Sequence, residues 1–106
     1  MSNDDAPVLV RPTPSQPLEI WATDRIFFVF DGFVLEAFGA GMGSRSHIAH
    51  HPRLEFLEKR KLPIVRVNTD YRVPLEIAYD PVRRPGLEYL DSVLVASARE
   101  RRRALS

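Results

Sequence analysis

The first two thirds of the chain alternate between apolar and polar residues with the two-residue period of β-strands. The clearest segment covers residues 25–38, where Asp31 and Gly32 separate two apolar runs rich in phenylalanine. An Asp-Gly dipeptide between such runs is typical of a two-residue β-hairpin, whose inner face should form the centre of the core. On that face we expect Phe30 to pair with Phe33, Phe28 with Leu35, and Ile26 with Ala37. On the opposite face we expect Val29 to pair with Val34, Phe27 with Glu36, and Arg25 with Phe38.

Further strands are predicted on both sides of this hairpin. Pro74 has no N–H to donate to a β-ladder, so the strand that contains it should lie at a sheet edge. The predicted elements are strands over residues 18–22, 46–50, 64–67 and 73–79, a flexible glycine-containing loop over 39–44, and a turn over 68–70.

The apolar residues of segment 52–62 fit both the spacing of a strand and the spacing of a helix. Leu54 and Phe56 suit a strand, whereas Pro52 at a first-turn position and Leu54 with Leu57 at helical spacing suit a helix. We favour strand and turn. The alternative is a second helix near 52–62, which would make the fold a two-layer α+β structure.

From Gly86 onward, apolar residues recur at the spacing of an amphipathic helix, which we predict over residues 86–104. Pro85 suits the start of this helix, and arginines near its C-terminal end complement the helix dipole. Val93 and Val95 fall outside the apolar stripe and suggest a second contact surface, such as a dimer interface. The stripe consists of Leu87, Leu90, Leu94, Ala98 and Leu105.

The chain is therefore expected to be mainly β with a C-terminal helix, as a partly open barrel or sandwich that the helix closes. Its 106 residues suit one domain. We place this domain at residues 18–106, after a flexible proline-rich tail over residues 1–17.

Composition excludes several classes of protein. The chain has no cysteine, which excludes disulfides and thiolate zinc sites, and its net charge of +1 gives no overall attraction to nucleic acid or anionic membranes. The acidic N-terminus and the lack of a long apolar run predict a cytoplasmic protein without membrane insertion. Only Lys59 and Lys61 of the 15 basic residues are lysine. We interpret this bias as a sign of bacterial origin.

Three histidines, His47, His50 and His51, are the candidate metal ligands. On a strand His47 and His51 share a face while His50 points the other way, so we expect no metal site and no cofactor. Ser44 and Ser46 beside His47 lack an identifiable carboxylate to orient the histidine as a base. We therefore expect no catalytic residue and no enzyme activity.

Basic and apolar surface positions indicate an interaction module instead. Arginine side chains could contact the phosphates of phospholipid or nucleic acid. The sheet edge near residues 73–79 and the outer side of the helix could bind a protein partner or a second copy. The candidate interaction residues are Arg45, Pro74, Val93, Val95, Arg99, Arg102 and Arg103.

The order of short antiparallel strands over about residues 18–80 and one helix over about 86–104 resembles bacterial pleckstrin-homology-like domains. Residues 28–35, with the glycine loop and Ser46–His50 after them, look like the early strands of that family. The resemblance implies two sheets in a partly open barrel whose end the helix closes. The loop after Phe38 carries Arg45 alone, without the family's Lys-x-Arg arrangement for phosphoinositides. We expect a non-catalytic module that binds a protein or itself, with anion binding as the alternative and a small histidine-dependent enzyme as a third possibility.

Overall fold

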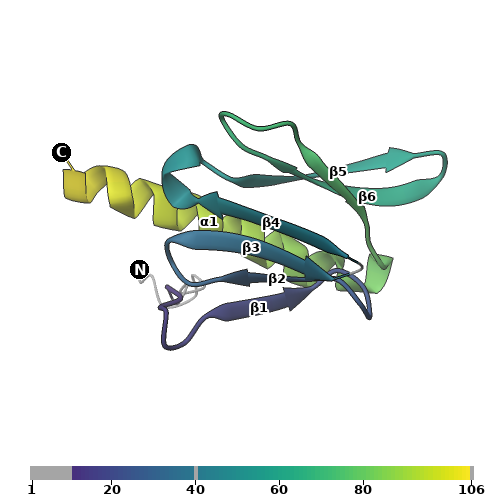
Figure 1. Cartoon of the computed structure of the whole chain (residues 1–106), viewed down its shortest axis with the longest axis horizontal. Coiled ribbons are helices and arrows are strands. Elements are labelled where there is room, and N and C mark those ends of the chain that lie inside the picture. The colour runs from purple at the N-terminus through teal and green to yellow at the C-terminus, as the bar shows by residue number, and fades with distance from the viewer. Residues whose placement is uncertain (1–10, 40, 106) are drawn as a thin grey trace, which may run out of the picture.

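The computed structural model describes residues 11–39 and 41–105, and within them seven antiparallel strands form two sheets beside one long helix (Figure 1). The first sheet has the order β1-β2-β3-β4, and the second has the order β5-β6-β7. The strands are β1 (Leu18–Trp21), β2 (Phe27–Phe30), β3 (Val34–Gly39), β4 (Met42–His47), β5 (Arg53–Lys59), β6 (Leu62–Asn68) and β7 (Leu75–Ala78). The helices are the 3-10 helices η2 (Ile48–His50) and η3 (Pro81–Arg83), and α1 (Arg84–Leu105).

This arrangement confirms the predicted mainly β fold with a C-terminal helix. The two sheets do not close into a barrel, which fits the partly open sandwich. The alternative helix near residues 52–62 is wrong, because β5 and β6 pair along their whole length from Arg53↔Asn68 to Lys59↔Leu62. The turn between them uses Arg60 and Lys61, whose φ angles are 53° and 67°.

The hairpin around Asp31 and Gly32 is present, but its predicted register is wrong by two residues. Phe30 pairs with Leu35 and Phe28 with Ala37. The Oδ1 atom of Asp31 accepts hydrogen bonds from the backbone N–H groups of Phe33 and Val34, both at 2.8 Å. Asp31 therefore ends the strand, and Gly32, with φ 96°, is the first of the two central turn residues.

The shift of two residues leaves each side chain on its predicted face, because side chains alternate with period two. The inner residues of β2 and β3 are accordingly buried, whereas Phe33 at the turn is 46% exposed. The buried inner residues are Phe28, Phe30, Leu35 and Ala37.

The predicted flexible loop over residues 39–44 and strand over 46–50 need correction. Gly39 pairs with Met42, so β4 begins there and ends at His47, and η2 follows it. Gly39 and Gly41 have φ angles of 120° and 75°, which let the chain reverse tightly where a longer loop was expected. A Cβ atom on Gly39 would lie 1.9 Å from the carbonyl oxygen of Arg25.

The last strand lies at the edge of its sheet, as predicted, but it covers only Leu75–Ala78, so the predicted bounds of 73–79 are too wide and Pro74 lies just before the strand. The backbone N–H of Asp80, just beyond β7, donates to the carbonyl of Ala22, just beyond β1, at 2.9 Å. One corner of the sandwich is therefore joined by the backbone itself.

The helix packs against both sheets, with contacts to β1 and β5. Leu87, Leu90 and Leu94 are buried as the apolar stripe predicted. Val93 is only 1% exposed, so its prediction as an outer contact residue is wrong. The physical reason is that two sheets, rather than one, enclose the helix over a wide arc.

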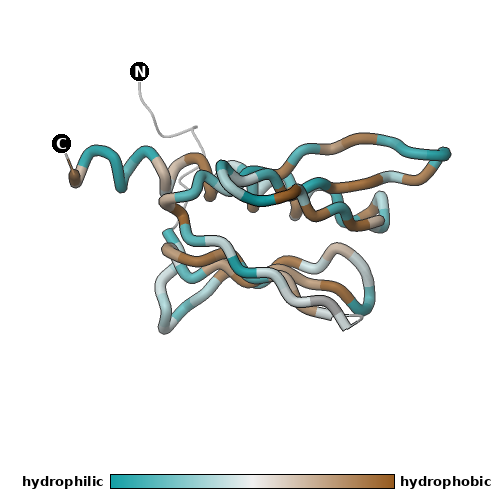
Figure 2. The backbone as a smooth tube through the Cα atoms, turned by 45° about the horizontal axis from the view of Figure 1, so that its top comes forward, coloured by the Kyte–Doolittle hydropathy of each residue, from teal (hydrophilic) through white to brown (hydrophobic). Residues whose placement is uncertain are grey.

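The C-terminal end of α1 reaches past the sheets (Figure 1), and its tube is mostly hydrophilic there (Figure 2). Leu105, predicted as part of the apolar stripe, is exposed. The stripe therefore contacts the core only along the first half of the helix and at Ala98, which packs against the core cluster.

The predicted N-terminal tail lies partly outside the described residues, which begin at Arg11. Pro12 is buried, and Thr13 and Gln16 exchange two backbone hydrogen bonds of 3.2 and 3.0 Å. The Arg11 guanidinium lies 5.5 Å from the centre of the Phe33 ring and 3.2 Å from a carboxylate oxygen of Glu100. This segment therefore contacts both the β2–β3 turn and α1.

Candidate functional site

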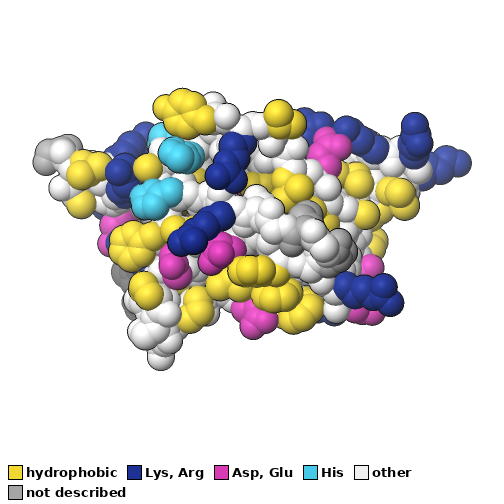
Figure 3. All heavy atoms as spheres, in the orientation of Figure 1, with side chains coloured by type: hydrophobic (Ala, Val, Ile, Leu, Met, Phe, Trp, Pro, Cys, Tyr) yellow, Lys and Arg dark blue, Asp and Glu magenta, His cyan; other side chains and the backbone are white. Residues whose placement is uncertain are grey.

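Three aromatic side chains form one row across the outer face of the first sheet. Trp21 is the cross-strand partner of Phe27, and Phe27 is the partner of Phe38. Ring centroids are 4.6 Å apart for Trp21 and Phe27, and 5.3 Å apart for Phe27 and Phe38. We call these three residues the aromatic ridge. Trp21 and Phe38 are each 37% exposed, and Figure 3 shows hydrophobic side chains gathered over β1–β3 on the outer face.

A charged row runs beside the aromatic ridge on the same face. Its cross-strand partners are Glu19 with Val29, Val29 with Glu36, and Glu36 with Arg45. Two carboxylates and one guanidinium thus border the ridge. At the β4 end of the aromatic ridge, Phe38 pairs with Gly43. Because Gly43 has no side chain, this end of the ridge is left open.

Sequence reasoning missed the aromatic ridge because of the register error at Asp31. The expected pairs, Phe27 with Glu36 and Arg25 with Phe38, separate the two phenylalanines. The observed shift of two residues brings them together. The signal that could have found the row was the ability of the Asp31 side chain to cap the two N–H groups after Gly32.

The outer face of the second sheet has a different character. Arg66 on β6 is the partner of Glu55 on β5 and of Glu76 on β7, and it forms ion pairs with both, at 3.3 and 2.7 Å. Lys59 donates to both carboxylate oxygens of Glu76 at 2.8 Å. This face is therefore charged and internally paired, whereas the first sheet exposes stacked rings.

The two cations beside Glu76 give a prediction about acid stability. Hydrogen bonds from Lys59 and then from Arg66 lower the pKa of the Glu76 carboxyl below its ordinary value. A carboxyl with a lowered folded-state pKa stabilises the fold above its unfolded pKa, and this contribution is lost as the pH falls through the folded pKa. Glu76→Gln should therefore lower the melting temperature at pH 7, and the difference from wild type should shrink as the pH falls below about 4.3, the ordinary pKa of a glutamate, and vanish once Glu76 is protonated in the folded state.

Melting curves recorded at each pH check this. Glu58→Gln is the control, since Glu58 lies in the same sheet and its side chain has no hydrogen bond or ion pair within the described residues. A Glu76→Gln difference that does not shrink as the pH is lowered through the acidic range would contradict the electrostatic cause.

A cavity of about 140 Å³ lies between β5, the residues before it, and α1. Its apolar lining comprises Pro52, Val95 and Ala98, and its basic lining comprises His51, Arg53 and Arg102. We call it the basic cavity. It joins residues that are far apart in the sequence, and two of them, Val95 and Arg102, were predicted interaction residues.

Two carboxylates hold two of the three basic side chains of this cavity in place, those of Arg53 and His51. Asp91 on α1 accepts hydrogen bonds from Nε and Nη2 of Arg53, both at 2.9 Å, and from the backbone N–H of Leu54 at 2.8 Å. The hydrogen bonds that Arg53 donates to Asp91 raise the pKa of the Arg53 guanidinium. Asp70 Oδ2 lies 2.6 Å from Nδ1 of His51.

The three histidines have separate roles. Nδ1 of His47 accepts a hydrogen bond from the backbone N–H of Ala49 at 3.0 Å, and so caps η2. The ring of His50 packs edge-on against Tyr71 at 5.3 Å. His51 alone receives the acidic partner that sequence reasoning could not name, which is Asp70. Over residues 11–39 and 41–105, no group of three metal-ligating side chains comes together.

The predicted arginines are divided between surfaces. Arg99 and Arg103 line a separate hollow along α1 with Ala96 and Glu100, whereas Arg102 lines the basic cavity. Arg45 lies on the outer face of the first sheet, next to Glu36. Pro74 is exposed just before the edge strand β7.

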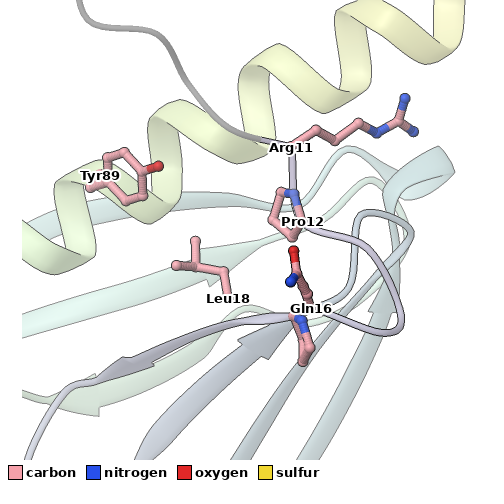
Figure 4. A pocket seen from close by; sticks show the side chains of 6 residues that line it. Arg11, Pro12, Gln16, Leu18 and Tyr89 are labelled. Atoms are coloured by element: carbon pink, nitrogen blue, oxygen red, sulfur yellow. The ribbon is translucent and has the colours of Figure 1, made fainter.

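A further hollow of about 150 Å³ lies between β1, α1 and the segment before β1. Arg11, Pro12, Gln16, Pro17, Leu18 and Tyr89 line it. Figure 4 shows Leu18 between Tyr89 of α1 and the side chains of Pro12 and Gln16, with the Arg11 side chain directed away from them. Among the described residues that line this hollow, none therefore directs a charged group into it.

Comparisons with known proteins yield no match to a family model, to a curated protein or to a solved structure. Within the described ranges, no helix combines the length and the hydropathy needed to cross a membrane.

Proposed function

We propose that this protein is a non-catalytic interaction module that binds a protein surface through the aromatic ridge, and that it is a bacterial protein located in the cytoplasm. The observation that carries this proposal is the row of Trp21, Phe27 and Phe38 on the outer face of the first sheet. Tryptophan and other large aromatic residues dominate binding energy at protein interfaces. A row of them left half-exposed on a folded domain supports a docking role.

The geometry of the rings favours protein over nucleic acid. Phe27 and Phe38 are stacked at 28°, and Trp21 and Phe27 are tilted by 30°, so ring faces that could stack on bases are already turned toward one another. Glu19 and Glu36 in the next row would repel phosphates. The chemistry suits a partner that offers aliphatic side chains to the ridge and a basic residue to the two carboxylates.

The arrangement of strands supports a pleckstrin-homology-like architecture for this module. Two antiparallel sheets of short strands, followed by a helix that contacts both sheets, match the order of elements on which that resemblance rests. The ridge lies on a sheet face rather than in the loop after Phe38, so the proposal does not depend on phosphoinositide binding.

The test compares the wild type with variants of the aromatic ridge in two measurements, the capture of a protein partner and self-association. Trp21→Ala and Phe38→Ala should each weaken retention of the partner roughly tenfold or more, since truncating an aromatic anchor removes most of its binding energy. Tyr71→Ala is the matched control, because Tyr71 is 79% exposed but lies in the loop before β7, away from the ridge. Melting temperatures of all variants verify that each one folds.

Two outcomes support the proposal: a retained protein that only the ridge variants lose, or a concentration-dependent dimer in sedimentation equilibrium that only the ridge variants lose. The second outcome would identify the partner as another copy of this chain. A wild-type protein that is monomeric at all concentrations, and whose retained proteins are unaffected by Trp21→Ala, would overturn it.

A further inference from the structure

The basic cavity has the features of a ligand site that is separate from the aromatic ridge. We propose that it binds a small organic carboxylate, that is, one carboxylate group attached to a short aliphatic body. This inference goes beyond the proposed function and involves none of the ridge residues.

Three basic side chains have hydrogen-bonding atoms left for a ligand. Arg53 uses Nε and Nη2 for Asp91, so its Nη1 atom has no partner among the described residues. His51 uses Nδ1 for Asp70, which leaves Nε2 without a partner in the same part of the chain. The Arg102 side chain forms no hydrogen bond or ion pair within residues 11–39 and 41–105. Guanidinium groups are well suited to planar, two-oxygen recognition of carboxylates.

The charge balance of the cavity favours a ligand with one negative charge. Asp91 neutralises Arg53, and the Arg102 side chain has no acidic partner among the described residues, so Arg102 supplies the surplus charge of the cavity lining. A carboxylate carries a single charge at neutral pH, whereas a phosphate monoester carries about −1.5 to −2. A phosphate would therefore bring more negative charge than the cavity compensates.

The size and lining of the cavity define the rest of the ligand. Its volume of about 140 Å³ is well below the 300–1,000 Å³ typical of sites for larger ligands and cofactors. It corresponds to roughly five water molecules at about 30 Å³ each, which suits a branched chain of four or five carbons. Pro52 is fully buried, and Val95 and Ala98 are half-buried, so the body of the ligand would rest on apolar atoms.

The experiment is an NMR titration of the full chain with isovalerate, using isovaleramide and inorganic phosphate as comparison ligands. Isovalerate should shift the backbone amide signals of Leu54, Val95 and Ala98, with a dissociation constant on the order of millimolar, as expected for so small a ligand. Isovaleramide, which has the same shape without the charge, should bind at least tenfold more weakly. Phosphate should leave these signals unchanged.

Matched variants locate the site. Arg102→Gln should weaken isovalerate binding about tenfold, since it removes a charge-assisted hydrogen bond. Arg99→Gln should leave binding unchanged, because Arg99 lies on the same helix but lines a different hollow. Ala98→Leu should abolish binding by filling the cavity, and Trp21→Ala should retain it even if the aromatic ridge proves to have no partner.

A further arm distinguishes two sources of the same carboxylate chemistry. If an acetylated Gly-Gly-Val peptide with a free C-terminus binds at least as tightly as isovalerate, and its C-terminal amide does not bind, the natural ligand is a chain terminus. If only isovalerate binds, the ligand is a free acid. Equal binding of acid and amide, shifts caused by phosphate in place of isovalerate, or equal losses from Arg102→Gln and Arg99→Gln would overturn the proposal.

Discussion

Replacement of Leu94 by glycine is expected to lower the free energy of unfolding by roughly 3–6 kcal/mol. Leu94 is fully buried at the middle of α1. Truncating a buried leucine to alanine costs about 2–5 kcal/mol, and glycine in place of alanine costs about 1 kcal/mol more in a helix interior. Because domains of this size have stabilities of about 5–15 kcal/mol, this change would remove a large share of the total.

Urea unfolding followed by circular dichroism measures this loss. The control is Ser92→Gly, which makes the same backbone change at an exposed position two residues earlier. Its Oγ atom donates only to the carbonyl of Glu88, within the helix. We expect a loss of about 1 kcal/mol or less for Ser92→Gly. Similar losses for the two variants would mean that α1 does not pack against the sheets.

Replacement of Gly39 by alanine should have the second large effect, a loss of roughly 3 kcal/mol or more. The φ angle of Gly39 is 120°, a conformation that L-residues rarely adopt, and the new Cβ would meet the carbonyl oxygen of Arg25 at 1.9 Å. A backbone carbonyl cannot rotate away as a side chain can. Either the end of β3 or the segment before β2 would have to move, so backbone strain adds to the clash.

Gly41→Ala separates the clash from the backbone strain. Gly41 also has a positive φ angle, 75°, but a Cβ at this position meets nothing within 4 Å. We expect a loss of about 1–2 kcal/mol for this variant, from the left-handed conformation alone. Equilibrium unfolding of both variants gives the comparison. A Gly39→Ala protein as stable as Gly41→Ala would show that the end of β3 yields easily.

The alternation of apolar residues was sufficient to predict most of the core residues of the hairpin, although Phe33, assigned to the same face, is exposed at the turn. It assigned Phe28, Phe30, Leu35 and Ala37 to the inner face, and they are buried. It could not fix the register, because a shift of two residues preserves every face. The local chemistry of the Asp31 side chain decides the register, and the aromatic ridge depends on it.

The segment over residues 52–62 shows why the period alone can be ambiguous. Its apolar spacing suits both a strand and a helix, and long-range pairing with β6 selects the strand. Val93 was misassigned for a related reason. A single apolar stripe describes a helix on one surface, whereas α1 is enclosed by elements from both sheets.

The basic cavity could not be predicted from the sequence, because its contacts join distant segments. Asp70 follows its partner His51 by 19 residues, and Asp91 follows Arg53 by 38 residues. Neither carboxylate belongs to a motif of fixed spacing. Only the fold brings them beside the basic residues, and it places Arg102 with them while Arg99 and Arg103 face another surface.

Asp91 has a consequence for how the helix can move. Packing between leucines is non-directional, so an apolar stripe by itself would allow α1 to slide or roll by small amounts. The three hydrogen bonds of Asp91 to Arg53 and Leu54 permit only one axial and rotational setting of α1 against β5. These hydrogen bonds therefore keep α1 from sliding along β5 or rotating against it. Because Asp91 lies in the first half of α1, they also set the distance between Arg53 and Arg102.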